Sequence, residues 1–80
     1  MTIAYTTTKG KYARTYNATV GDLVVELEKT NPEYLGWCIF IERVVGDETV
    51  TAYHSYSQTL AEAKERASIF VVSDQLLATV

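Results

Sequence analysis

A strand pair followed at once by an amphipathic helix is the feature that most limits how this chain can fold. Residues 37–45 have the composition of a strand, Gly46-Asp47 predicts a turn, and residues 50–56 predict the returning strand. Thr59 and Glu62 then have the spacing of a helix capping box. A hairpin and a helix that each carry one apolar surface can cover one another. The segment therefore predicts a compact α+β domain.

The two-residue turn sets the expected register of this hairpin, with Val45 opposite Glu48. Alternation along the two strands then divides the side chains between two faces. The expected core face carries Trp37, Ile39, Ile41, Arg43, Val50, Ala52, His54 and Tyr56, and the other face carries Cys38, Phe40, Glu42, Thr51, Tyr53 and Ser55. On this register Phe40 and Tyr53 form a cross-strand aromatic pair. Cys38 and His54 point to opposite sides of the sheet.

The last helix is expected to pack an apolar stripe on the hairpin. The stripe consists of Leu60, Ala63, Ala67, Phe70 and Val71. Glu62 and Arg66 are spaced i, i+4 for a favourable ion pair. The tail, residues 75–80, is compatible with a last strand, a further helical turn or an apolar arm.

The first 29 residues predict a hairpin and one element of ambiguous type. Residues 3–7 and 11–17 are rich in Thr and Tyr and predict two strands around a Thr8-Lys9-Gly10 turn. In residues 20–29 a helical period competes with the alternation of Leu23, Val25 and Leu27, which would indicate a half-buried strand. A weak cap formed by Thr19 and Asp22, and a stop at Asn31-Pro32, favour the helix.

These elements give a complete expected fold for the 80 residues as a single α+β domain. The expected order is β-β-α-β-β-α, a small antiparallel sheet of two hairpins packed against two helices. A short strand in the tail would make the second half ferredoxin-like.

Composition and motifs exclude several classes of protein. Cys38 is the only cysteine, so the chain has no internal disulfide or multi-cysteine zinc site, which fits a reducing cytoplasm. The apolar runs are shorter than a membrane span, and the first residues do not resemble a signal peptide. The sequence has no phosphate-binding glycine loop and no metal-binding motif. We therefore expect a cytoplasmic, non-enzymatic protein without cofactor or metal.

Charge is unevenly distributed along the chain, whose net charge is −3. Residues 1–17 carry three basic residues and no acidic one, whereas residues 18–80 carry four basic residues and all ten acidic ones. The basic segment is a candidate contact for an anionic partner. The acidic remainder disfavours general nucleic-acid binding, which depends on many phosphate contacts.

Aromatic residues indicate the expected function. So small a core cannot bury all six tyrosines, and tyrosine is enriched at protein interfaces. We expect a protein–protein interface, with a homodimer as one form of it. The candidate residues are Lys9, Lys11, Tyr12, Arg14, Tyr16, Tyr34, Phe40 and Tyr53. The alternative is a nucleic-acid-binding module in which Tyr12, Arg14 and Tyr16, on one strand face of the N-terminal hairpin, contact the bases and backbone.

In size, acidity and lack of catalytic motifs, the whole chain resembles the small proteins that phages encode to inhibit host machinery, including anti-CRISPR and antirestriction proteins. The resemblance is one of organisation and implies an inhibitor that binds a host protein. It assigns no role to any single residue.

Overall fold

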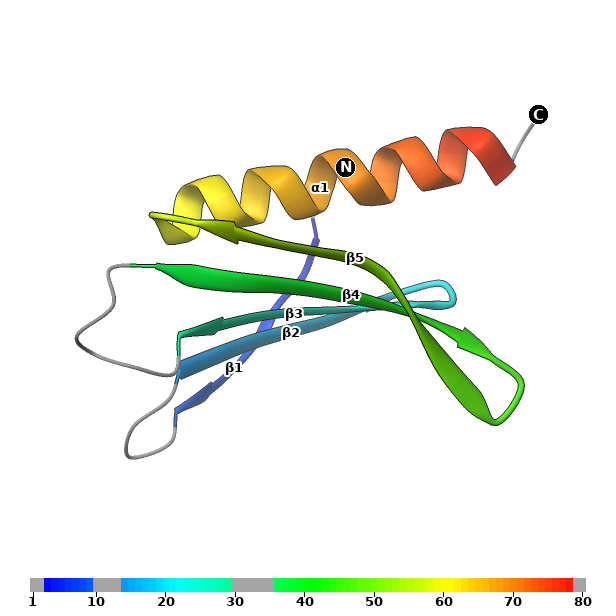
Figure 1. Ribbon diagram of the computed structural model, residues 1–80, viewed down its shortest axis with the longest axis horizontal. Coiled ribbons are helices and arrows are strands. Elements are labelled where there is room, and N and C mark those ends of the chain that lie inside the picture. The colour runs from blue at the N-terminus through cyan, green and yellow to red at the C-terminus, as the bar shows by residue number, and fades with distance from the viewer. Residues whose placement is uncertain (1–2, 10–13, 30–35, 79–80) are drawn as a thin grey trace.

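A five-stranded sheet with one helix on one face makes up the protein (Figure 1). The computed structural model describes residues 3–9, 14–29 and 36–78. The elements in chain order are β1 (Thr6–Lys9), β2 (Arg14–Val20), β3 (Leu23–Lys29), β4 (Trp37–Val45), β5 (Glu48–Ser57) and α1 (Leu60–Ala78). Each strand pairs antiparallel with the next, so the sheet order is the chain order.

The prediction of two helices in the order β-β-α-β-β-α is wrong, because five strands precede a single helix. The ferredoxin-like arrangement is wrong for a second reason. Residues 75–78 continue α1 instead of forming a last strand. Of the alternatives for the tail, the further helical turn is the one that forms, and residues 79–80 lie outside the described part of the chain.

The helix predicted at residues 20–29 is the strand β3. Leu23, Val25 and Leu27 alternate with half-buried neighbours and are each at most 1% exposed. Gly21, with φ of 62°, and Asp22 form the two-residue turn that pairs Val20 with Leu23. A left-handed glycine suits such a turn but not the first turn of a helix. Burial of the alternating residues therefore outweighs the weak cap.

The first predicted hairpin forms, with different limits. β1 and β2 pair antiparallel, as expected. β1 begins at Thr6 and includes Thr8 and Lys9, which were assigned to the turn. Residues 10–13, where the connection lies, are outside the described ranges.

The β4–β5 hairpin has the predicted turn but not the predicted faces. Val45 lies opposite Glu48 across Gly46-Asp47, as expected. A bulge then shifts the register, since Ile41 pairs with Tyr53 while Glu42 pairs with Thr51. The extra residue on β5 reverses the direction of every side chain beyond it. His54 and Tyr56 therefore face away from the core, and the predicted Phe40–Tyr53 pair is wrong.

The core lies between α1 and the nearer face of the sheet. Its fully buried side chains are Val25, Leu27, Ile39, Ile41, Ala63, Ala67 and Val71. Thr59 caps the helix, since the Glu62 amide donates to its Oγ1 at 3.1 Å. The predicted Glu62–Arg66 ion pair forms at 2.9 Å. Phe70, expected in the apolar stripe of the helix, is partly buried and stacks on Tyr53 at 5.2 Å between ring centroids.

One charged residue links the helix to the sheet outside this core. Arg43 on β4 pairs with Asp22 in the β2–β3 turn at 2.6 Å and with Asp74 on α1. The predicted position of Arg43 on the core face is thus confirmed, but the side chain reaches the rim, where it is one-third exposed. The two carboxylates hold the C-terminal half of α1 over β3 and β4.

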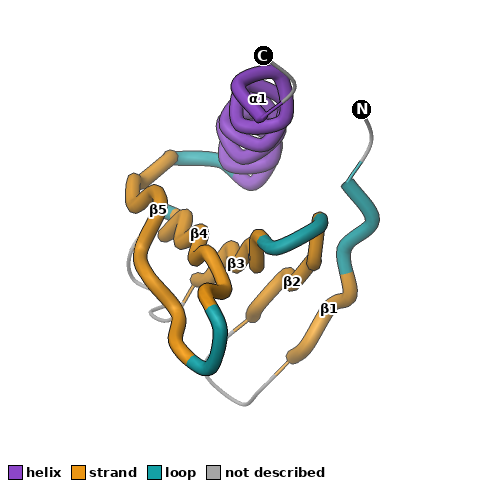
Figure 2. Tube along the Cα trace, turned by 90° about the vertical axis from the view of Figure 1, so that its right-hand side faces the viewer, coloured by secondary structure: helices purple, strands orange, loops and turns teal. Residues whose placement is uncertain are grey.

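The helix covers only part of the sheet. α1 packs over β3, β4 and β5, and it lies to one side of β1 and β2 (Figure 2). The residues before β1 rise beside α1, whereas the turn end of the β4–β5 hairpin bends away from the helix (Figure 2). The opposite face, called the open face below, is covered by nothing within the described residues.

Candidate functional site

The open face is a continuous surface across all five strands. Its members are identified by cross-strand register, because residues directly opposite on adjacent strands share a face. They are Thr6 and Thr8 on β1, Thr15, Asn17 and Thr19 on β2, Val24, Glu26 and Glu28 on β3, Cys38, Phe40, Glu42 and Val44 on β4, and Thr49, Thr51, His54 and Tyr56 on β5. Threonines line β1 and β2, three carboxylates lie in the middle on β3 and β4, and aromatic rings lie on β4 and β5, where Thr49 and Thr51 continue the face toward the hairpin turn.

Three rings form an aromatic row on β4 and β5. Phe40 lies opposite His54 with ring centroids 5.1 Å apart, and the His54 and Tyr56 rings are 5.2 Å apart. The bulge in β5 places the latter two rings on this face. Tyr56 is 68% exposed, which is high for a tyrosine in a strand. The row offers apolar area together with polar ring atoms, as interface residues do.

Cys38 and His54 meet on the open face, contrary to the sequence prediction. The Cys38 Sγ lies 3.3 Å from the His54 Nε2 because the bulge brings both side chains to one side of the sheet. Burial raises the pKa of the Cys38 thiol, and the charges of Glu28 and Glu26 raise it further. A nucleophilic cysteine needs a lowered pKa. The surroundings therefore oppose the thiolate that nucleophilic catalysis would require.

Three carboxylates lie beside the aromatic row. Glu26 is opposite Phe40, Glu28 is opposite Cys38, and Glu42 follows on β4. A side-chain hydrogen bond with Glu28 raises the pKa of Glu26, and burial and the charges of Glu28 and Glu42 raise it further. Like charges this close disfavour ionisation of the Glu26 carboxyl. A cation brought to this surface would relieve that repulsion.

The raised pKa of Glu26 leads to a stability prediction for Glu26→Gln. A carboxyl whose pKa is raised in the folded state stabilises the fold below its ordinary pKa, and this contribution is lost as pH rises through the folded-state pKa. The variant should therefore gain stability over the wild type at pH 7, by about 0.5 kcal/mol after screening by solvent. The gain should vanish toward pH 4. Urea unfolding across this range measures it.

The matched control for this prediction is Glu65→Gln, on the exposed side of α1. It removes one negative charge without touching the three open-face carboxylates. An equal gain in the control would show that net charge, and not the cluster around Glu26, sets the effect.

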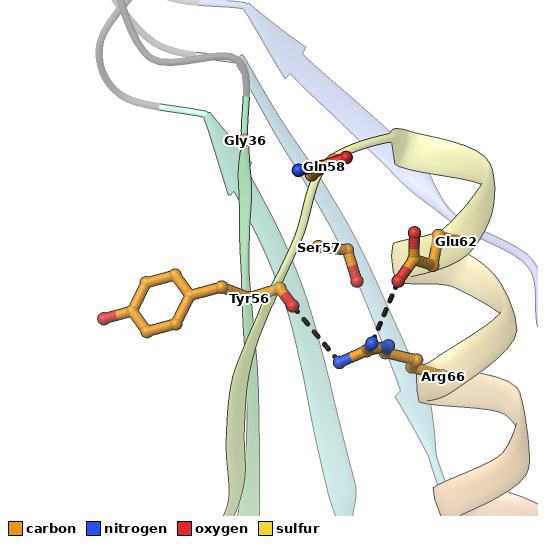
Figure 3. A pocket seen from close by; sticks show the side chains of 6 residues that line it. All are labelled: Gly36, Tyr56, Ser57, Gln58, Glu62 and Arg66. Carbon is orange, nitrogen blue, oxygen red and sulfur yellow. Dashed lines mark hydrogen bonds and ion pairs between the residues drawn. The ribbon is translucent and has the colours of Figure 1, made fainter.

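An open pocket of about 420 Å³ lies where β5 meets the start of α1 (Figure 3). It is lined by Gly36, Tyr56, Ser57, Gln58, Glu62 and Arg66. The Arg66 guanidinium donates to the Tyr56 carbonyl at 3.2 Å and pairs with Glu62. Arg66 thus satisfies a backbone acceptor of the sheet and is itself neutralised. This pairing leaves the pocket without an unbalanced charge among its lining residues.

The predicted site residues do not form one surface. Phe40 is on the open face, whereas Lys9, Arg14 and Tyr16 lie on the helix side of the sheet. Tyr53 is also on the helix side, against Phe70. Lys11, Tyr12 and Tyr34 fall outside the described residues.

Sequence reasoning missed the carboxylates and half of the aromatic row. On the helix predicted at residues 20–29, Glu26 and Glu28 would diverge, whereas on a strand their spacing of two places them on one face. The alternation of Leu23, Val25 and Leu27 contained that signal. His54 and Tyr56 were assigned to the core face, and no sequence signal marks the bulge that turns them outward.

Within the described ranges, no group of three or more His, Cys, Asp or Glu residues could hold a metal ion. Among the same residues, no helix has the length and apolar character needed to cross a membrane. Comparison with models of known protein families, with curated proteins and with solved structures found no match to this chain. Any functional conclusion therefore rests on the geometry above.

Proposed function

We propose that this protein is a non-enzymatic binding protein that acts through a protein–protein interface on its open face. The observation that carries the proposal is an uncovered five-stranded face on which an aromatic row lies directly beside three carboxylates. Aromatic anchors next to charged groups are typical of protein interfaces. The expected binding residues are Phe40, His54 and Tyr56, with Glu26, Glu28 and Glu42.

The expected partner is a protein surface with lysine or arginine residues around an apolar depression. The aromatic row would fill the depression, and the basic residues would meet the carboxylates. Such complementarity speeds association and rejects partners of the wrong charge. The raised pKa of Glu26 adds to this preference, because a basic partner lowers the cost of ionising it.

A second copy of this chain fits the open face poorly. The described residues of that face include no lysine or arginine. Two copies packed face to face would therefore bring six carboxylates into one interface without a balancing charge. The charge pattern supports a different protein as the partner.

An inhibitor of the kind that phages encode is one specific form of this function. Its support is the organisation of the chain and an acidic surface suited to a basic site on host machinery. A host protein that binds nucleic acid has a basic binding site, which is the charge that would complement this acidic surface.

Capture from the lysate of the native host, after nuclease treatment, tests the proposal. The wild-type protein should retain a specific protein, and Phe40→Ala or Tyr56→Ala should weaken that complex by roughly 30-fold or more, as loss of a hot-spot ring does. Cys38 is the only cysteine and lies on the open face. Alkylation of Cys38 should therefore slow markedly when the captured partner is bound.

The matched control is Ile69→Ala, which removes an exposed apolar side chain from α1. It should leave both capture and the protection of Cys38 unchanged. Loss of every partner after nuclease treatment would contradict the proposal. So would a complex that tolerates both open-face variants, or one in which Cys38 is alkylated as fast as in the isolated protein.

A further inference from the structure

Three basic residues lie directly opposite one another on three adjacent strands, on the helix side of the sheet. Lys9 on β1 pairs with Arg14 on β2, and Arg14 pairs with Lys29 on β3. Like charges directly opposite on neighbouring strands destabilise a sheet. Within the described residues, no carboxylate forms an ion pair with any of the three. The arrangement therefore opposes folding stability and calls for another explanation.

A fourth cation joins this row from the helix. The Lys64 Nζ lies 5.5 Å from the centre of the Tyr5 ring and 5.0 Å from the centre of the Tyr16 ring. Tyr16 is two residues along β2 from Arg14. Lys9, Arg14, Lys29 and Lys64 together are called the basic cluster. Its position beside β1 and β2 is where α1 leaves the sheet uncovered (Figure 2).

The aromatic rings near the basic cluster are covered. The Lys29 Nζ lies 6.0 Å from the centre of the Trp37 ring, which is only 7% exposed. Tyr16 is half-buried between Tyr5 and Trp37, with ring centroids 6.4 and 5.6 Å away, and Lys64 lies over it. Lys29 and Lys64 lie against these rings, and the half-buried Tyr16 ring already has Lys64 over it. The cluster thus offers positive charge without an aromatic platform.

Three acidic residues of the sheet are on its other side, and the fourth, Glu48, lies at the β4–β5 turn, at the end of the sheet away from the basic cluster. Glu26, Glu28 and Glu42 all belong to the open face. The N-terminus of α1, which carries a partial positive charge, lies at the same end of the sheet as the basic cluster (Figure 1). The net charge of −3 therefore conceals a positive surface. This separation removes the objection that the acidic body opposes binding of an anion.

We propose that the basic cluster binds the phosphate backbone of nucleic acid without regard to base sequence. Adjacent strands are about 4.8 Å apart, so the row across three strands spans about 10 Å. Duplex DNA presents one charge per roughly 1.7 Å, so such a row meets several phosphates. An acidic protein would also need apolar anchors, and the rings that could supply them are covered. The site is independent of the open face, on the opposite side of the sheet.

Fluorescence anisotropy with labelled 20-nucleotide single strands and duplexes, between about 20 and 200 mM salt, tests this inference. Four phosphate contacts give a slope of log K against log salt of about −3 to −4 on duplex DNA. Strands of different base composition should bind within a few-fold of one another. The double variant Lys9→Ala and Arg14→Ala, which changes two exposed side chains, should weaken binding at low salt by at least about tenfold and reduce the slope by about 2.

Two control variants separate position from net charge. Arg66→Gln removes a cation that is outside the cluster and paired with Glu62, and it should bind like the wild type. The double variant Glu26→Gln and Glu28→Gln changes the net charge by two units, as the Lys9 and Arg14 variant does, but on the open face. It should alter affinity by much less than tenfold.

The inference is overturned if the two double variants change the affinity by equal factors in opposite directions, because affinity would then depend on net charge and not on the position of the charges. It is also overturned if no binding is detected at about 20 mM salt, or if the slope is shallower than about −1. A preference of more than tenfold for one base composition would contradict backbone binding. Equal binding of polyglutamate and DNA would replace nucleic acid with an acidic protein as the ligand.

Discussion

Replacing Trp37 with alanine is expected to lower the free energy of unfolding by about 3–5 kcal/mol, a large share of the stability of so small a domain. Trp37 is 7% exposed and belongs to the core cluster, with the Tyr16 ring 5.6 Å away and the Lys29 ammonium over its face. Its loss would leave a cavity between β2, β4 and the start of α1. Urea unfolding followed by circular dichroism measures the change without relying on tryptophan fluorescence.

Tyr56→Ala is the matched control for Trp37→Ala, because its ring is 68% exposed on the same hairpin. It should change stability by no more than about 0.5 kcal/mol. If Trp37→Ala unfolded at the same urea concentration as the control, Trp37 would have to be a surface residue. The register of β4 would then be wrong.

The last two elements of the fold could be predicted because their signals are local. The turn at Gly46-Asp47 fixes the pairing of Val45 with Glu48, so the turn and the pair that it joins span only four residues of sequence. The cap at Thr59 and the buried stripe through Ala63 and Ala67 are likewise set within one or two helical turns. Such signals depend little on the rest of the chain.

β3 could not be assigned with the same security, because its sequence satisfies two local patterns. Val24 and Leu27 fit a helical period, and Leu23, Val25 and Leu27 fit a strand. The structure decides for the strand through contacts with β2 on one side and β4 on the other. β4 is separated from β3 by a longer stretch of sequence, and strand preference depends on such neighbours more than helix preference does.

The candidate binding surfaces depended on the same long-range information. The bulge opposite Ile41 and Glu42 decides that His54 and Tyr56 join Phe40 on the open face. The pairing of β2 with β3 decides that Lys29 joins Arg14 and Lys9. The sequence indicated a surplus of tyrosines and a basic N-terminal segment. It could not show that the three open-face glutamates and the three basic residues of β1, β2 and β3 lie on opposite faces of one sheet.

The contact between helix and sheet provides the second large expected effect, in the variant Ala67→Leu. Ala67 is fully buried in the core cluster, which also contains the fully buried Val25 of β3 and Ile39 of β4, and its small side chain lets α1 approach these strands closely. Three added carbons have no space, so the helix must move or the side chain must adopt a strained conformation. We expect a loss of about 1–3 kcal/mol, the usual cost of overpacking. For a domain of this size that corresponds to a melting temperature lower by roughly 5–20 °C.

Ala61→Leu adds the same three carbons on the exposed side of α1 and is the control for this effect. Both variants replace one strong helix former with another, so intrinsic helix preference changes little in either. A difference in melting temperature between them therefore reports the space between helix and sheet. If Ala67→Leu and Ala61→Leu had the same melting temperature, α1 could not pack closely on the sheet. The extent of the uncovered area beside β1 and β2 would then no longer follow from the position of α1. If the two differ as expected, the position of α1 is fixed by its alanines, and with it the limits of the surface that carries the basic cluster.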